Sequence, residues 1–194
     1  MNDNRSKKIA LSSHCLLNQN SKVLGLARSP GIIPGLIDVL NSYNYGILQM
    51  PCPELRTAGL SRWGQVRNQY ESAGFIKAFS LLADFVCDDV YEYKKAGYKI
   101  ILIGVDGSPS CGVNVTEENE EWGGSILRLG TEKLKVYNTK RNGVFVELLK
   151  GIVKDKLNLD LPAIGIPVDL YEKEIDLNPL SHFLSKLEDE CKGA

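Results

Sequence analysis

Four short runs of apolar residues stand out along the chain. They read "KIALSS" at 8–13, "YGILQM" at 45–50, "KIILIGV" at 99–105 and "PAIGIPV" at 162–168. Each run is nearly continuous rather than alternating, which is typical of strands that are buried on both faces of a sheet. The pattern therefore predicts four buried strands.

Helical periodicity fills most of the sequence between these runs. The clearest helix ends at Gly97, a residue type that favours helix C-termini, and its apolar residues recur at helical spacing. Those residues are Phe75, Phe79, Leu82, Val86, Val90 and Tyr93. A weaker helix fits 32–43, another carries Phe145, Leu148, Leu149 and Ile152 on one face, and a last one covers about 179–190.

Strands thus alternate with helices along the chain. Such alternation predicts an α/β fold: three layers with a mostly parallel sheet, Rossmann-like or flavodoxin-like, with helices on both faces and right-handed crossovers. No repeat, low-complexity tract or linker rich in Pro, Gly or Ser divides the sequence. We therefore expect one domain over residues 1–194.

Composition narrows the classes of partner. The 194 residues are 43% hydrophobic, enough for one well-filled core, and 23 basic residues balance 24 acidic ones. This near-neutral charge offers no electrostatic footprint for a nucleic-acid polymer or an anionic membrane. The N-terminal apolar run is too short for a signal peptide, and no window resembles a membrane span. We expect a cytoplasmic monomer or loose homodimer.

Three of the five cysteines follow predicted strands directly. Cys15 comes after the first strand, Cys52 after the second and Cys111 after the third. The carboxyl ends of parallel strands share one edge of a sheet, where ligands bind, so these thiols should converge. Cys87 lies inside the long predicted helix and Cys191 near the chain end, which indicates structural or incidental roles.

A site with three thiolates admits more than one occupant. Structural zinc normally takes four protein ligands, often in C-x-x-C pairs, and the sequence contains no such pair. A catalytic zinc with three thiolates and a water stays open as an alternative, with His14 as an optional fourth ligand. An iron–sulfur cluster is the other occupant that suits soft ligands, because thiolates favour such clusters.

The segments around these cysteines resemble a known family. "SSHCLL", "PCPEL" followed by "GL", and "GSPSCG" are similar to the three cysteine motifs of the DUF523 family, which includes the 2-thiouracil desulfidases called TudS. The resemblance covers about the first 115 residues. It implies a 4Fe-4S cluster held by Cys15, Cys52 and Cys111, with one open iron that takes sulfur from a thiolated nucleobase without redox change.

The chain departs from the family pattern in two places. The family reads "CLLG" with "RYDG" nearby, whereas this chain reads "CLLNQNSKV"; after "CPE" it reads "LRTAGLSRWGQ" instead of "GGLPTPR". The chain is accordingly identified as a divergent member, and the resemblance carries over the cluster ligands but not the substrate pocket.

The expected chemistry converts C=S to C=O and hydrosulfide. An open iron would polarise the thiocarbonyl, and water would attack its carbon. Glu54, two residues after Cys52, is the candidate general base, and Asp106, at the end of the third strand, is the second candidate. The flanking hydroxyls of Ser108 and Ser110 are candidates to orient substrate or to hydrogen-bond cluster sulfur.

Further residues near the motifs are candidates for binding a small thiolated substrate. Asn18 and Asn114 follow cysteines and could recognise a base edge, while the segment "ELRTAGLSRWG" could form a lid over a planar ring. The lid candidates are Arg56, Arg62 and Trp63. The acidic stretch at 116–124 is interpreted as a solvated loop or a flap, and His182 as a packed or exposed residue.

Two alternatives from other classes stay open. One is a cluster- or metal-binding sensor of redox state or iron that turns nothing over. The other is a cluster-free sulfurtransferase that carries persulfide on Cys111, where a nearby helix N-terminus would lower the pKa of the thiol.

Overall fold

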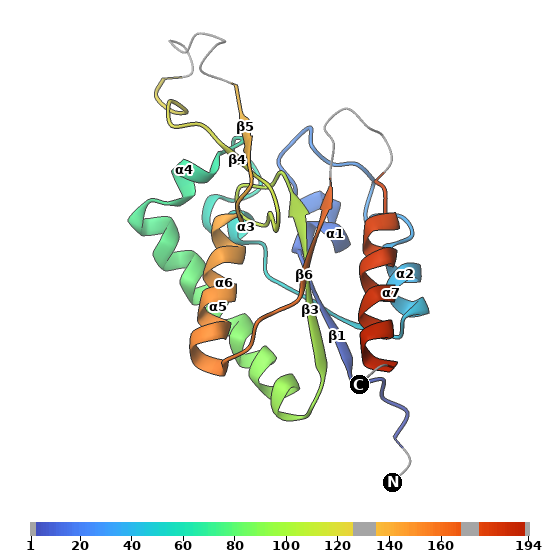
Figure 1. The fold of residues 1–194 in the computed structure, drawn as a ribbon. Helices are drawn as coiled ribbons and strands as arrows, with labels where there is room; N and C mark the ends of the chain where they lie inside the picture. Colours follow the sequence, from blue (N-terminus) through green and yellow to red (C-terminus); the bar gives the residue numbers. More distant parts are fainter. Residues whose placement is uncertain (1–2, 126–134, 168–174, 193–194) are drawn as a thin grey trace.

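The structure is a computed structural model that describes residues 3–125, 135–167 and 175–192 (Figure 1). Its centre is a four-stranded sheet in the order β2-β1-β3-β6, in which every neighbouring pair is parallel. The strands are β1 (Lys8–Ser12), β2 (Gly46–Gln49), β3 (Lys99–Asp106) and β6 (Ala163–Pro167). All four predicted strands are confirmed.

The strand order matches the flavodoxin-like arrangement of doubly wound sheets. In that arrangement the first strand has the second on one side and the third on the other, and ligands bind beyond the carboxyl ends of the strands where the winding reverses. This reversal lies between β1 and β3. The fold alone therefore directs attention to the loops that follow these two strands.

Helices cover both faces of the sheet, as the alternation of elements predicts (Figure 1). Ile9 and Leu102 pack in one apolar cluster with α5 (Ala73–Lys95) and α6 (Val144–Leu157). The neighbouring positions of the same strands, such as Ala10, Ile101 and Ile103, belong to a second cluster. That cluster includes residues of α2 (Leu36–Ser42) and α7 (Asn178–Lys192). The strands are buried on both faces, which explains their continuous apolar sequences.

Short elements gather at the carboxyl end of the sheet. They are α1 (His14–Leu17), the 3-10 helix η1 (Gln19–Ser21), α3 (Pro53–Ala58) and α4 (Arg67–Tyr70). The described residues include no helix with both the length and the apolar character needed to cross a membrane.

A small antiparallel pair, β4 (Thr116–Glu118) and β5 (Tyr137–Thr139), stands beyond this end of the sheet (Figure 1). The interpretation of 116–124 as a solvated loop is therefore wrong for its first three residues. Arg67, almost fully buried, forms ion pairs with Glu118 of β4 and Glu147 of α6 at 3.4 and 2.8 Å. Glu118, which lies in the acidic stretch interpreted as solvated, thus attaches β4 to the body of the protein through its ion pair with Arg67.

Gly104 of β3 allows the loop that carries Cys111 to fold back against the strand. A Cβ at Gly104 would lie 2.4 Å from the Cys111 carbonyl oxygen, which accepts a hydrogen bond from the Val105 amide. We expect Gly104→Ala to destabilise the protein by about 1–3 kcal/mol, because the added methyl group displaces backbone. Urea denaturation checks this value.

The matched control is Gly151→Ala, in the middle of α6, where a Cβ would meet no atom within 4 Å. Alanine is the better helix former, so we expect this change to stabilise the protein by about 0.5–1 kcal/mol. Equal effects of the two substitutions would contradict close packing at Gly104.

Candidate functional site

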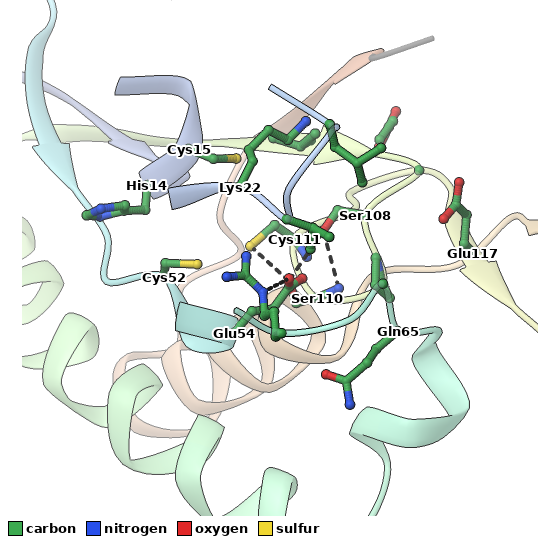
Figure 2. A pocket seen from close by; sticks show the side chains of 18 residues that line it. His14, Cys15, Lys22, Cys52, Glu54, Gln65, Ser108, Ser110, Cys111 and Glu117 are labelled. Atoms are coloured by element: carbon green, nitrogen blue, oxygen red, sulfur yellow. Dashed lines mark hydrogen bonds and ion pairs between the residues drawn. The ribbon is translucent and has the colours of Figure 1, made fainter. Parts of the chain in front are cut away.

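The structure brings Cys15, Cys52 and Cys111 to one cavity at the carboxyl edge of the sheet (Figure 2). The cavity has a volume of about 140 Å³. Cys15 lies in α1, Cys52 is the N-cap residue of α3, and Cys111 lies in the loop after β3. Within the described ranges, no three His, Cys, Asp or Glu side chains are arranged around a single metal-ion position.

Local structure fixes the position of each cysteine. The Ser13 amide donates to the Ile103 carbonyl, which anchors the entrance to α1 on β3. Pro53 begins α3, and the Leu55 amide donates to the Cys52 sulfur at 3.4 Å, so the thiol caps the helix. The Cys111 amide donates to Ser108 Oγ at 3.0 Å, which tightens the turn that presents this thiol.

Burial sets the protonation of these thiols. It raises the pKa of Cys15 to about 12, and it also raises the pKa of Cys52 and, to well above its ordinary value, that of Cys111. The charges of Cys15 and Cys52 raise the pKa of Cys111 further, so the thiols lie within electrostatic range of one another. Without a metal ion among them, the three side chains are neutral thiols at pH 7.

The expected activation of Cys111 by a helix N-terminus is wrong. The α6 helix does begin beside this loop, but its first amides donate to backbone carbonyls: Val144 to Pro109, and Phe145 and Val146 to Ser110. The helix dipole is therefore directed at the backbone of the turn, while burial raises the pKa of the thiol. A persulfide carrier needs the opposite shift.

Glu54 lies in the first turn of α3 and lines the same cavity, with 8% of its surface exposed. Its Oε1 accepts a hydrogen bond of 2.6 Å from Ser110 Oγ, and its Oε2 pairs with Arg62 Nε at 3.1 Å. Figure 2 shows this carboxylate beside Cys111. A carboxylate, a hydroxyl and a guanidinium thus form one connected group next to the thiols.

Arg62 is a buried anchor rather than a mobile lid residue. Besides its pair with Glu54, its Nη1 donates to the Gly59 carbonyl and its Nη2 to the Ser21 carbonyl, both at 2.9 Å. These bonds tie the segment after α3 to the segment after α1. The arginine therefore holds Glu54 in place and fixes two walls of the cavity.

Asp106 lines the cavity, but its carboxylate is used to hold the loop. Its Oδ1 accepts from the amides of Val113 and Asn114 at 2.9 and 2.8 Å, and its Oδ2 accepts from Asn114 Nδ2 at 2.9 Å. These contacts make it a poorer candidate base than Glu54. They also engage the Asn114 side chain away from the cavity.

Other candidate residues do not line the cavity. Asn18 caps η1 by accepting from the Asn20 amide, Arg56 is exposed on α3, and Trp63 is 73% exposed. Cys87 is buried in the core on α5. His182 is exposed on α7, and the side chain of Cys191 lies outside the described residues.

Sequence reasoning missed two charged residues of the cavity wall, Lys22 and Glu117 (Figure 2). Lys22 follows η1, and its place after the first strand could have marked it as a candidate. Glu117 belongs to β4, and the surrounding acidic run gave no signal that one carboxylate turns inward. His14, considered as a metal ligand, also lines the cavity, and burial lowers its pKa.

Comparisons with known proteins bear on the family of the chain. A family profile described as "Putative 2-thiouracil desulfurase" matches residues 33–123, a range that includes Cys52, Glu54 and Cys111 but not Cys15. "Uncharacterized protein MJ0003" of Methanocaldococcus jannaschii is 39% identical over 109 residues, which cover 56% of this chain and 70% of that protein. No solved structure matches significantly. The chain therefore belongs to the 2-thiouracil desulfurase family that this profile describes.

Proposed function

We propose that this protein is a 4Fe-4S-dependent, non-redox desulfidase that removes sulfur from a small thiolated compound such as a thiolated nucleobase. The observation that carries the proposal is the convergence of Cys15, Cys52 and Cys111 on one cavity that also contains Glu54 bonded to Ser110. Family membership supports the desulfurase activity. The cluster and the roles of individual residues rest on the chemistry of the cavity.

The donor set suits an iron–sulfur cluster. Thiolates are soft ligands that favour such clusters, and three of them on four irons leave one iron without a protein ligand. When bound, the cluster would supply a Lewis-acidic iron with affinity for a thiocarbonyl sulfur. Cys15, Cys52 and Cys111 would hold it. Because these thiols are protonated without metal, cluster assembly releases protons and weakens in acid.

Glu54 serves as the general base in this proposal. Water attacks the thiocarbonyl carbon and gives one proton to the carboxylate. The C–S bond then breaks, the sulfur takes that proton from Glu54 and leaves as hydrosulfide, and the hydroxyl proton of the adduct is released to solvent as the carbonyl forms. Ser110 donates to Glu54 and therefore orients the carboxylate toward the thiols. Arg62 provides its counter-charge and prevents it from rotating away.

A base beside the thiols favours an enzyme over a sensor. A protein that only senses iron or redox state needs neither a cavity over its cluster nor a carboxylate in that cavity. Glu54 is nevertheless held there by two side chains, at the energetic cost of burying a charge. A carboxylate positioned in a cavity beside candidate ligands is a candidate catalytic group.

Anaerobically reconstituted protein, incubated with 2-thiouracil and no added reductant, tests the function. We expect uracil and sulfide in equal amounts, with the new carbonyl oxygen derived from isotopically labelled water. Protein that carries a full cluster but releases no sulfide from 2-thiouracil or other cyclic thiones would refute the proposal. Metal-free protein serves as the blank.

A further inference from the structure

The charged side chains that line the cavity fall into two groups. Glu54 and Arg62 pair with each other, and Asp106 accepts hydrogen bonds from the backbone of its own loop. Lys22 and Glu117 differ, because neither has a hydrogen bond or a close ion pair among the described residues. Two charges of opposite sign thus line the cavity with their polar atoms uncommitted.

Strand geometry directs Glu117 toward the cavity. Successive side chains of a strand point to opposite faces, so Glu117 and Glu118 of β4 diverge. Glu118 is engaged by Arg67 and Arg141, both at 3.4 Å. Glu117 instead lies over Gly107, where an added Cβ would be 4.0 Å from its Oε1. The ion pairs of Glu118 therefore hold Glu117 against the loop that leads to Cys111.

Lys22 is held on another wall of the same cavity. The carbonyl of the preceding residue, Ser21, accepts a hydrogen bond from Arg62, which fixes the backbone at this point. Burial raises the pKa of Cys15 and of Glu117, and the Lys22 charge offsets part of the rise in both. The Lys22 charge thus acts on a thiol and on the carboxyl group of Glu117, and Figure 2 shows the Lys22 side chain beside Cys15.

We propose that Lys22 and Glu117 are specificity-determining residues that bind the polar edge of the substrate ring, Lys22 by donating to a ring carbonyl oxygen and Glu117 by accepting from a ring N–H. This inference rests on the proposed function, since it concerns the substrate of the same cavity. It assigns a binding role to residues that neither hold the cluster nor take part in proton transfer.

The chemistry of the pair selects for a particular kind of ring. An ammonium group and a carboxylate together add no net charge, so they suit a neutral ligand with a donor and an acceptor at its edge. A charged ligand would meet repulsion from one of the two groups. A ring that lacks the acceptor leaves the Lys22 ammonium group without a partner, which weakens binding.

Binding of two rings that are not consumed tests the inference on reconstituted protein. The second carbonyl group of uracil is the acceptor assigned to Lys22, whereas 2-pyridone has one N–H and only the carbonyl that takes the place of the reacting C=S. We expect Lys22→Met to weaken uracil binding about 10- to 100-fold and to leave 2-pyridone nearly unchanged. Glu117→Leu should weaken both rings, because both supply an N–H. Isothermal titration calorimetry measures the dissociation constants.

The matched controls are Lys140→Met and Glu120→Leu, at exposed positions that do not line the cavity. Neither should change affinity, and iron content should be the same in all five proteins. Loss of iron in Lys22→Met would overturn the inference, because the lysine would then support the cluster. Uracil bound no more tightly than 2-pyridone by wild type, including no binding of either, would also overturn it.

The turnover assay separates this inference from the proposed function. If 2-thiouracil is hydrolysed while both cavity variants bind the two rings as wild type does, only the role of Lys22 and Glu117 fails. If the expected affinity pattern appears without hydrolysis, the reaction fails and the binding role stands.

Discussion

Replacing Cys15, Cys52 or Cys111 by alanine is expected to abolish stable cluster binding, whereas Cys87→Ala is expected to preserve it. The first three thiols line one cavity, and the fourth is buried in the core on α5. A cluster that loses one of three thiolates has two exposed irons and dissociates readily. Wild-type protein should contain about four irons per chain after anaerobic reconstitution.

Iron and acid-labile sulfide analysis, with visible absorption spectra, measures this effect on all four variants. Cys87→Ala is the matched control because it removes the same atoms from a buried thiol outside the cavity. Retention of full iron content in any of the three cavity variants would exclude that cysteine as a ligand. Equal loss in Cys87→Ala would indicate that unfolding, not ligand removal, releases the iron.

Glu54→Gln is expected to lower kcat by about 10²–10⁴-fold, the usual contribution of a positioned acid–base group. The amide keeps the size of the side chain and can still accept a hydrogen bond from Ser110, but it cannot take a proton from water. Because Glu54 is not a proposed ligand, the iron content should stay at the wild-type value. Initial rates of sulfide release, normalised to iron, measure the effect.

Two comparisons make this result specific to the base. Glu92→Gln changes an exposed carboxylate of α5 and should leave the rate unchanged. Asp106→Asn tests the second candidate base: because Asp106 holds the loop through Val113 and Asn114, we expect lower thermal stability as well as lower activity. A Glu54→Gln rate within about threefold of wild type, an energetic difference under 1 kcal/mol, would exclude Glu54 as the base.

Much of the fold could be predicted because its signals are local. The four strands are continuous apolar runs, and the helices between them repeat at helical spacing, so their order leads to a parallel sheet with helices on both faces. The convergence of the cysteines could be anticipated for the same reason, since each follows a strand whose carboxyl end lies at one edge. A single domain over 1–194 and a cytoplasmic location stay predictions.

The partners of the cavity side chains could not be predicted from sequence. Arg62 appeared suited to a lid, yet it is buried against Glu54 and the Ser21 carbonyl, and Asp106 binds the loop it precedes. Both side chains are close in sequence to the motifs. The hydrogen-bond partners of the two side chains depend on where backbone carbonyls and amides from other parts of the sequence lie after folding.

The sequence by itself determined the strands, the helices between them and the edge to which the three cysteines belong, because these follow from local periodicity and from the geometry of parallel sheets. Only the tertiary structure decided that β4 pairs with β5, that Arg67 fastens β4 to the body, and that Glu117 consequently joins Lys22 in the cavity wall. These contacts join residues far apart in the chain, and their energies depend on distance and burial that no local pattern contains.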